Sequence, residues 1–380
     1  MNPQYFSITP QDAWFFRDGR PYNHRESNQA AVESVFPPPA RTLTGALRAA
    51  LARTNGWDGK LHGWPKDAAN CFGNGPNDLG QLQFTGPFLI RENETGATEA
   101  LWPVPRHLLG RSHAGHWRPL AFLQPDEKET ETDIGRCRLP RLLLPAGQRP
   151  DGLKPAGTAW ITAAGLTCIL GGKAPGAEML HRPDTLWQFE SRVGLQRDAA
   201  TLNVGEGDLY SPTYVRLCRK VALGVGLEGV PNNMNGLPSL FPLGGESRLA
   251  QAESWHGNPV PNCPPANTFK PDSNGFVRFI VVLLTHGCFK NPAPFLSSGA
   301  KIISACVDKP QLIGGWDSLK NEPLALEPFH PAGSVWFCEA PAAELPNILA
   351  QNGQWLGDYH THGFGQIVIG LWPSKSPLQQ

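Results

Sequence analysis

A proline run followed by an amphipathic pattern constrains the fold of this chain more than any other stretch. Residues 36–53 read FPPPARTLTGALRAALAR. Consecutive prolines fix φ and lack amide donors, so the chain must enter this stretch extended. Apolar residues then recur at three- and four-residue steps from Leu43 to Leu51, and Thr42 is in position for an N-cap. The sequence therefore predicts a helix over residues 43–53 whose apolar stripe faces a core.

The other face of this helix has the chemistry of an anion site. Arg41, Arg48 and Arg53 lie off the apolar stripe, and Gly45 leaves the first turn without a side chain. Unpaired amides at the start of a helix accept anions such as phosphate. The alternative is an ordinary core helix whose arginines are solvated.

An aromatic loop precedes the helix. Residues 10–21, PQDAWFFRDGRP, set Phe16 and two further aromatic residues beside Arg17. Aromatic faces next to guanidinium groups suit stacked bases and their phosphates. This combination makes the loop a candidate contact for single-stranded nucleic acid.

A long hairpin is predicted over residues 185–223. Apolar and polar residues alternate from Trp187 to Gln196 with the period of a half-buried strand, and a second strand is expected from Tyr210 to Leu223. The face turned away from the core would carry Arg192, Arg216 and Lys220. The alternative is an exposed hairpin with ordinary surface arginines.

Two further segments have unusual charge patterns. Residues 102–119 hold several arginines and histidines, which favour either a nucleic-acid patch or a solvated loop. Residues 125–133, PDEKETETD, are strongly acidic and lack apolar anchors, so we expect a mobile surface insertion there.

Composition excludes several classes of protein. Lysine plus arginine and aspartate plus glutamate both number 33, so there is no global positive field for non-specific nucleic-acid binding. The 41 glycines and 38 prolines favour many loops over a helical bundle. The eight cysteines are too widely spaced for a zinc site, and no apolar run is long enough to span a membrane. We therefore expect a cytoplasmic protein with reduced thiols, without a metal or other cofactor.

The aromatic loop and the proline-led helix together resemble the amino-terminal signature of the RAMP superfamily of CRISPR proteins. More narrowly they are similar to the family of third Cmr subunits of type III-B effector complexes. The segments ESRVGLQRDAATLNVGEGDLYSPTYVRL, LIGGWD and PAGSVWFCE also resemble this family. Where the family pattern commonly has two threonines before the helix, this chain has Arg41 and Thr42, which replaces one hydroxyl contact by a cation.

The resemblance implies an α+β fold of two ferredoxin-like (RRM-like) βαββαβ domains with a protruding β-hairpin thumb and long loop insertions. A faint internal repeat agrees, because Leu237 and Leu345 each begin a Leu-Pro segment followed by glycines and a strand. The helix would be the first helix of the first unit and the hairpin its middle strands. The expected domains are residues 1–257 and 275–380, joined by a proline-rich linker over 258–274.

For function, the resemblance implies a non-catalytic RNA-binding subunit. It would hold the 5′ handle of the crRNA and bridge the large polymerase-like Cmr subunit to the backbone Cmr subunit, with target RNA nearby. Phe16 and Tyr210 would stack on or wedge against bases, and Thr42 and Gly45 would line the helix start. The expected phosphate contacts are Arg17, Arg41, Arg48, Arg192, Arg197 and Arg248, and the positions where RNA backbone would approach closely are Gly244, Gly245, His362, Gly363 and Gly365.

Two rival functions stay open. The first is a RAMP endoribonuclease that processes repeat RNA, with His360 or His362 as a general base on a 2′-hydroxyl. Against it, both histidines are better explained as neutral hydrogen-bonding loop residues. The second is a purely protein-binding bridge without any RNA contact.

Overall fold

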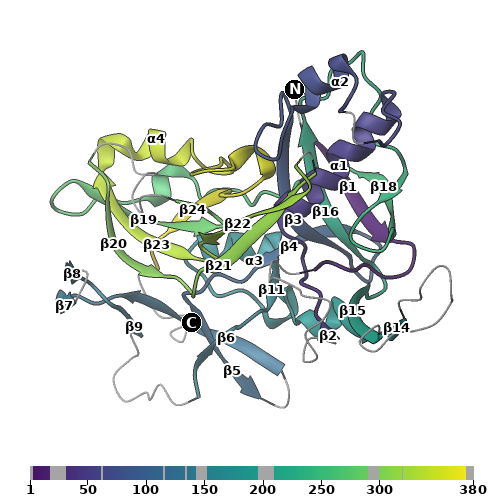
Figure 1. The fold of residues 1–380 in the computed structure, drawn as a ribbon. Helices are drawn as coiled ribbons and strands as arrows, with labels where there is room; N and C mark the ends of the chain where they lie inside the picture. Colours follow the sequence, from purple (N-terminus) through teal and green to yellow (C-terminus); the bar gives the residue numbers. More distant parts are fainter. Residues whose placement is uncertain are drawn as a thin grey trace. The chain divides into compact units, whose positions relative to one another are not determined.

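The computed structural model describes residues 3–17, 31–60, 63–113, 116–132, 135–142, 152–195, 209–289, 299–318 and 320–373. Within these ranges the fold is mixed α+β, mostly sheet with few helices, so the expected class is confirmed (Figure 1). None of the helices there is long and apolar enough to cross a membrane.

The chain forms two compact units, and both are discontinuous. Unit 1 comprises Met1–Gly96, Asp184–His256 and Leu312–Glu327, and unit 2 comprises Ala97–Pro183, Gly257–Gln311 and Pro328–Gln380. The chain thus passes between units at residue 257, close to the expected linker, but residues 97–183 group with the carboxyl-terminal part. The division into domains 1–257 and 275–380 stays a prediction.

Unit 1 is built on an antiparallel sheet. Its strands lie in the order β3 (Gln83–Glu92), β16 (Val221–Glu228), β1 (Gln4–Pro10), β18 (Leu249–Trp255) and β17 (Leu240–Pro242). Side chains cannot be added at two glycines of β16, because a Cβ at Gly224 would lie 2.2 Å from the Phe88 ring and one at Gly226 2.8 Å from Tyr5. Gly224 and Gly226 are therefore required for close packing within the sheet.

The predicted helix is present as α1 (Ala40–Thr54), and Leu43, Leu47 and Leu51 are buried as expected. It begins earlier than predicted, and the expectation that Thr42 caps it is wrong. The N-cap residue is Pro39, whose carbonyl accepts hydrogen bonds from the amides of Thr42 and Leu43. The proline run thus sets the helix start by itself, and no side-chain cap is needed.

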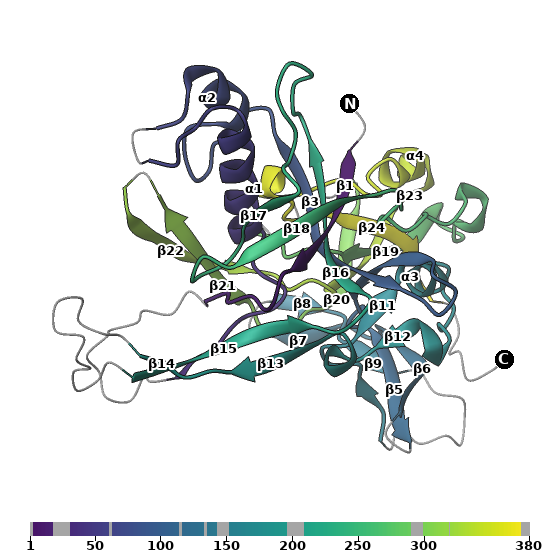
Figure 2. The same cartoon turned by 90° about the vertical axis from the view of Figure 1, so that its right-hand side faces the viewer.

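The predicted hairpin is also present. In it β13 (Trp187–Ser191) and β14 (Gly194–Leu195) pair antiparallel with β15 (Leu209–Leu217), as Figure 2 shows. Its strands belong to a sheet separate from that of β1, β3, β16 and β18, so the expectation that the hairpin supplies the middle strands of the first unit is wrong. The chain turns at Lys220, with φ +66°, so the single strand expected from Tyr210 to Leu223 divides between two sheets.

In the first strand of this hairpin, the expected half-burial is found only at the start. Trp187 is 7% exposed, whereas Phe189 and Val193 are 54% and 70% exposed. Alternation in the sequence identified this strand correctly, but the described residues of unit 1 leave the far part of its apolar face uncovered.

Unit 2 contains an antiparallel sheet in the order β20 (Lys301–Cys306), β23 (Val335–Pro341), β19 (Phe276–Leu283) and β24 (Ile367–Leu371). A nearly continuous apolar run, which is typical of a central strand, forms β19, and this strand has a neighbour on each side. Alternate residues of β19 form a core with residues of β23, β24 and the short helix α4 (Leu345–Leu349).

The remaining elements fall into smaller groups. Unit 1 also holds β2 (Ala31–Val32), α2 (Lys66–Phe72) and most of a two-stranded ribbon, β21 (Gln311–Asp317) with β22 (Glu322–Phe329). Unit 2 holds β4 (Thr98–Pro103), β11 (Trp160–Thr162), β12 (Leu180–His181) and α3 (Ala163–Leu170). It also holds the sheet β10 (Lys154–Pro155), β5 (Leu108–His113), β6 (His116–Pro125), β9 (Pro140–Leu142), and the ribbon β7 (Thr130–Thr132), β8 (Gly135–Cys137).

Five 3-10 turns complete the described chain: η1 (Ala177–Met179), η2 (Pro183–Thr185), η3 (Ala266–Thr268), η4 (Ala342–Glu344) and η5 (His360–His362). The acidic segment expected to be a mobile insertion contributes residues 130–132 to a strand, which pairs across to Arg136 and its neighbours.

Candidate nucleic-acid interface

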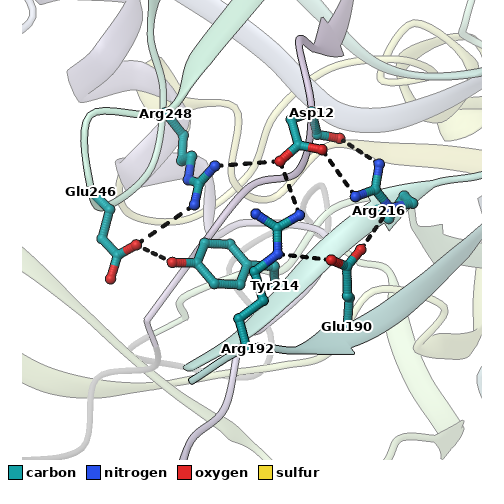
Figure 3. A network of polar contacts seen from close by, with 7 residues as sticks. All are labelled: Asp12, Glu190, Arg192, Tyr214, Arg216, Glu246 and Arg248. Carbon is teal, nitrogen blue, oxygen red and sulfur yellow. Dashed lines mark hydrogen bonds and ion pairs between the residues drawn. The ribbon is translucent and has the colours of Figure 1, made fainter. Parts of the chain in front are cut away.

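Three arginines of unit 1 converge on one aspartate. Asp12 follows β1, Arg192 follows β13, Arg216 lies on β15 and Arg248 precedes β18 (Figure 3). Segments that are distant in the sequence are thus brought together by pairing in the sheet and the hairpin. We call these residues, with Glu190, Tyr214 and Glu246, the arginine cluster.

Two carboxylates bridge the two hairpin arginines. Arg192 donates to Glu190 Oε1 at 2.7 Å and to Asp12 Oδ2 at 2.9 Å. Arg216 donates to the other oxygen of each, Glu190 Oε2 at 2.7 Å and Asp12 Oδ1 at 2.9 Å. Glu190 stands opposite Tyr214 in the β13–β15 register, so it is a diagonal neighbour of Arg216 on the same face. The result is a closed ring of two guanidinium groups and two carboxylates.

Tyr214 forms the base of the cluster. Its ring centroid lies 4.8 Å from the guanidinium carbon of Arg192 and 4.5 Å from that of Arg248. Its hydroxyl donates a hydrogen bond to Glu246, and burial, followed by this carboxylate, raises the pKa of the tyrosine. Arg248 reaches Asp12 Oδ2 at 3.4 Å. The ring of Tyr214 therefore holds two of the three arginines in place by cation–π contacts.

The cluster is electrically balanced. Hydrogen bonds from Arg192 and Arg216 lower the pKa of Asp12, and bonds from Arg216 and Arg192 lower the pKa of Glu190. Both carboxylates are therefore ionised at neutral pH. The three guanidinium groups are matched by three carboxylates, those of Asp12, Glu190 and Glu246, so the formal charge of the cluster is zero.

The glycine pair before Arg248 packs against the aromatic loop. The amide of Gly245 donates to the Phe15 carbonyl at 2.8 Å, and a Cβ at Gly244 would lie 2.7 Å from the same oxygen. Gly244 has φ +85°, which favours glycine as well. Close approach of a main chain at these positions was expected, but in this structure the chain's own Phe15 backbone makes it. Their proposed contact with RNA stays a prediction.

Phe16 belongs to the core. It is 2% exposed, and its ring centroid lies 5.6 Å from that of Trp14 and 6.3 Å from that of Phe36. Stacking on a base would require an exposed ring, but Phe16 is covered by Trp14 of its own loop and by Phe36 of the proline-led segment. Arg17 is exposed, and its backbone forms a bridge with Ser34.

Arg48 does not lie on a solvated face, contrary to expectation. It is 7% exposed and donates to the carbonyls of Phe72, Gly75 and Asp78 at 2.8, 2.9 and 2.8 Å. Its guanidinium carbon is 4.9 Å from the Trp64 ring centroid. Arg48 thus connects α1 to the segment that contains α2.

Arg41 is likewise buried, at 8% exposure, and is paired with Glu327 at 3.0 Å. By contrast, Thr42 and Gly45 are exposed on the free face of α1, and a Cβ at Gly45 would meet no atom within 4 Å. These two positions are accessible, as expected, although their contact with RNA stays a prediction.

The carboxyl-terminal glycine loop is inside unit 2. His362 is 2% exposed, and the Gly363 carbonyl accepts a hydrogen bond from Thr285 Oγ1 at 2.7 Å. A Cβ at Gly365 would lie 1.9 Å from the Leu356 carbonyl oxygen. These residues were expected to meet RNA backbone, but the structure contradicts the exposure that such a contact requires. His360 is exposed.

Two expected contacts cannot be placed. Arg197 lies outside the described residues, and Tyr210 is described only by its backbone, in β15 opposite Gly194. In unit 2, the arginine- and histidine-rich segment forms the β5–β6 hairpin, where Arg111 stands opposite Arg118. Its role as a nucleic-acid patch stays a prediction.

Sequence reasoning missed four members of the cluster: Asp12, Glu190, Tyr214 and Glu246. Alternation along β15 places Tyr214 on the same face as Arg216, so that one residue was within reach of the pattern. In the part of the chain that the structure describes, no group of three or more histidine, cysteine, aspartate or glutamate residues is placed to hold a metal ion.

Comparison with known proteins gives one family match. The model of the family described as CRISPR-associated protein (Cas_Cmr3) matches residues 6–372. No curated protein matches the chain.

Among solved structures, two similar chains come from the type III-B Cmr-beta complex. One, bound to cognate target RNA, is 15% identical with a TM-score of 0.48, covering 96% of each chain. The other, bound to cognate target RNA and AMPPnP, has the same identity and score, covering 88% of this chain and 86% of that one. A chain from the Csm3–Csm4 subcomplex of the type III-A interference complex is 10% identical with a TM-score of 0.31, covering 88% and 92%.

Proposed function

Because the chain belongs to the CRISPR-associated protein (Cas_Cmr3) family, we propose that it is the third Cmr subunit of a type III-B CRISPR complex. In this role it is a non-catalytic RNA-binding subunit in antiviral defence. It holds the 5′ handle of the crRNA and bridges the large polymerase-like subunit to the backbone subunits.

The arginine cluster is the observation that carries the RNA-binding part of this proposal. The side chains of Arg192, Arg216 and Arg248 are 31%, 44% and 25% exposed, so they are held in place yet open to a ligand. Guanidinium groups bind phosphate with paired, directional hydrogen bonds. Because the whole chain has no net charge, a local group of arginines is what a neutral protein needs to hold one short stretch of RNA.

A salt titration tests this assignment. Replacing Arg192 or Arg216 by alanine should weaken binding of labelled single-stranded RNA that carries the handle. The slope of log K against log salt should become shallower by roughly 0.7 for each phosphate that the variant no longer neutralises. Arg278→Ala is the matched control, since Arg278 is also half-exposed and paired with a glutamate, but lies in unit 2. Slopes that are equal in the wild type, the cluster variants and the control would count against the cluster as the RNA contact.

The expected ferredoxin-like modules form part of the proposal. The four main strands of unit 1 lie across the sheet in the order β3, β16, β1, β18, which in chain order are the second, third, first and fourth. The sheet of unit 2, in the order β20, β23, β19, β24, has the same arrangement. α1 connects the first two strands of unit 1, and α4 precedes the last strand of unit 2. This shared connectivity supports two βαββαβ modules, although among the described residues no helix lies between β16 and β18 of unit 1 or between β19 and β20 of unit 2.

The ribbon β21–β22 supports the bridging role. Leu312, Trp316 and Leu326 on it are 63%, 55% and 42% exposed. Exposed apolar side chains gathered on one ribbon are typical of a protein contact, where tryptophan is enriched.

The rival ribonuclease would use His360 or His362 as its base, and the geometry disfavours His362 but not the exposed His360. A general base must come within hydrogen-bonding reach of the 2′-hydroxyl, and a side chain that is 2% exposed does not reach a bound RNA strand.

A further inference from the structure

Asp12 occupies the point on which the three arginines converge. Its carboxylate accepts from Arg192 and Arg216 at 2.9 Å each and from Arg248 at 3.4 Å (Figure 3). Carboxylate and phosphate are bound by guanidinium groups in the same paired geometry. A phosphate that met all three arginines would therefore have to take the place of Asp12.

Asp12 is also the cluster carboxylate best placed to leave. Its side chain is 45% exposed, more than those of Glu190 at 37% and Glu246 at 31%. Glu190 is joined to the Nε atoms of two arginines on its own hairpin at 2.7 Å, and Glu246 accepts from the Tyr214 hydroxyl. These contacts remain when Asp12 moves away, so the arginines stay ordered by Glu190 and by the ring of Tyr214.

We propose that Asp12 is an internal substitute for an RNA phosphate. In the free protein it neutralises and positions Arg192, Arg216 and Arg248, and on binding a phosphate of the RNA backbone displaces it. This inference rests on the proposed RNA-binding function. It adds that Asp12 lowers affinity, so that only an RNA making further contacts nearby is held.

The opposite possibility is that Asp12 only clamps the hairpin to the loop after β1. In that case its removal would release the arginines from their positions and weaken binding. The two possibilities thus predict changes of opposite sign.

The experiment compares RNA affinity in the wild type and in Asp12→Asn. Asparagine keeps the shape and one acceptor oxygen but removes the charge. Removing one unit charge about 4 Å from the phosphate in water is worth about 1 kcal/mol, so binding should tighten about fivefold. The salt slope should also steepen by roughly 0.7, since one more cation is free to exchange its counterion for phosphate.

Asp58→Asn is the matched control. Asp58 is 59% exposed in unit 1 and contacts Lys60 at 3.8 Å, so this variant makes the same change in net charge away from the cluster. Its affinity should equal that of the wild type within error. Asp12→Ser is a second variant, which removes the charge and also lacks the amide oxygen that Asp12→Asn retains. It should also bind RNA more tightly than the wild type.

Each outcome decides the question. If the wild type binds the RNA and both Asp12 variants bind it equally well or more weakly, Asp12 is not a substitute for phosphate and acts only as a clamp. Tighter binding by Asp58→Asn to the same extent assigns the effect to net charge and also overturns the proposal. If the wild type and all variants fail to bind, the proposed RNA-binding function itself falls, and the inference with it.

Discussion

Replacing Arg48 by methionine tests whether this buried guanidinium serves the fold rather than RNA. Its three hydrogen bonds to main-chain carbonyls, at 2.8 to 2.9 Å, are each worth about 1.5–3 kcal/mol because the donor is charged. Burial opposes them, since it lowers the pKa of Arg48 from 12.5 to about 10, which corresponds to about 3 kcal/mol. Methionine also keeps some apolar contact with Trp64. We therefore expect the free energy of unfolding to fall by about 3 kcal/mol.

Urea unfolding followed by circular dichroism measures this loss without depending on the nearby tryptophan. Arg53→Met is the matched control, because Arg53 is exposed on the last turn of the same helix and lies over the ring of Trp57 at 5.1 Å. In Arg53→Met the free energy of unfolding should fall by at most about 1 kcal/mol. In folded Arg48→Met the salt slope of RNA binding should match the wild type. A small loss of stability together with a shallower slope would refute the reasoning.

Two further predictions concern unit 2 and the ribbon. Burial lowers the pKa of His107 from 6.5 to about 3, so the unfolded chain takes up this proton first. The contribution of His107 to stability is therefore complete above pH 6.5 and should fall by about 1.4 kcal/mol for each pH unit between pH 6.5 and about 3. Burial also lowers the pKa of His286, from 6.5 to about 4, so His107→Phe should make the decline shallower by this amount without abolishing it; an unchanged pH profile in urea unfolding would contradict this. Trp316→Ser should change the free energy of unfolding by no more than about 0.5 kcal/mol, because the side chain is exposed. The variant should capture less of the large subunit than the wild type does, and undiminished capture would exclude the ribbon as the contact.

Elements that repeat a local pattern were predictable from the sequence. The apolar period of α1 and the continuous apolar run of β19 identify both elements. An element that buries one face repeats apolar residues at its own period, and a strand that buries both faces is apolar throughout. Helix α2 was missed, since residues 55–85 are rich in glycine, asparagine, aspartate and tryptophan and show little periodicity. Its position is fixed from outside, by the guanidinium of Arg48.

Exposure of single residues was far less predictable. Phe16 and Arg48 both have the chemistry of RNA contacts, but each is covered by a segment that lies elsewhere in the chain. The sequence shows what a side chain can bind, whereas the fold decides whether it reaches solvent. For Arg192 and Arg248 the fold left the side chains partly open, and pairing with Asp12 brought them together.

The carboxylates explain why arginines alone gave an incomplete description of the site. A sequence reading counts cations and predicts a positive patch, but Asp12 enters from a separate segment and balances them. A balanced cluster gives little attraction to a passing strand, because each phosphate must first displace a carboxylate. The displacement becomes favourable only when neighbouring phosphates or bases make contacts of their own. On the proposed function, such a site would bind one positioned stretch of RNA better than random RNA, which is the selectivity that holding the 5′ handle requires.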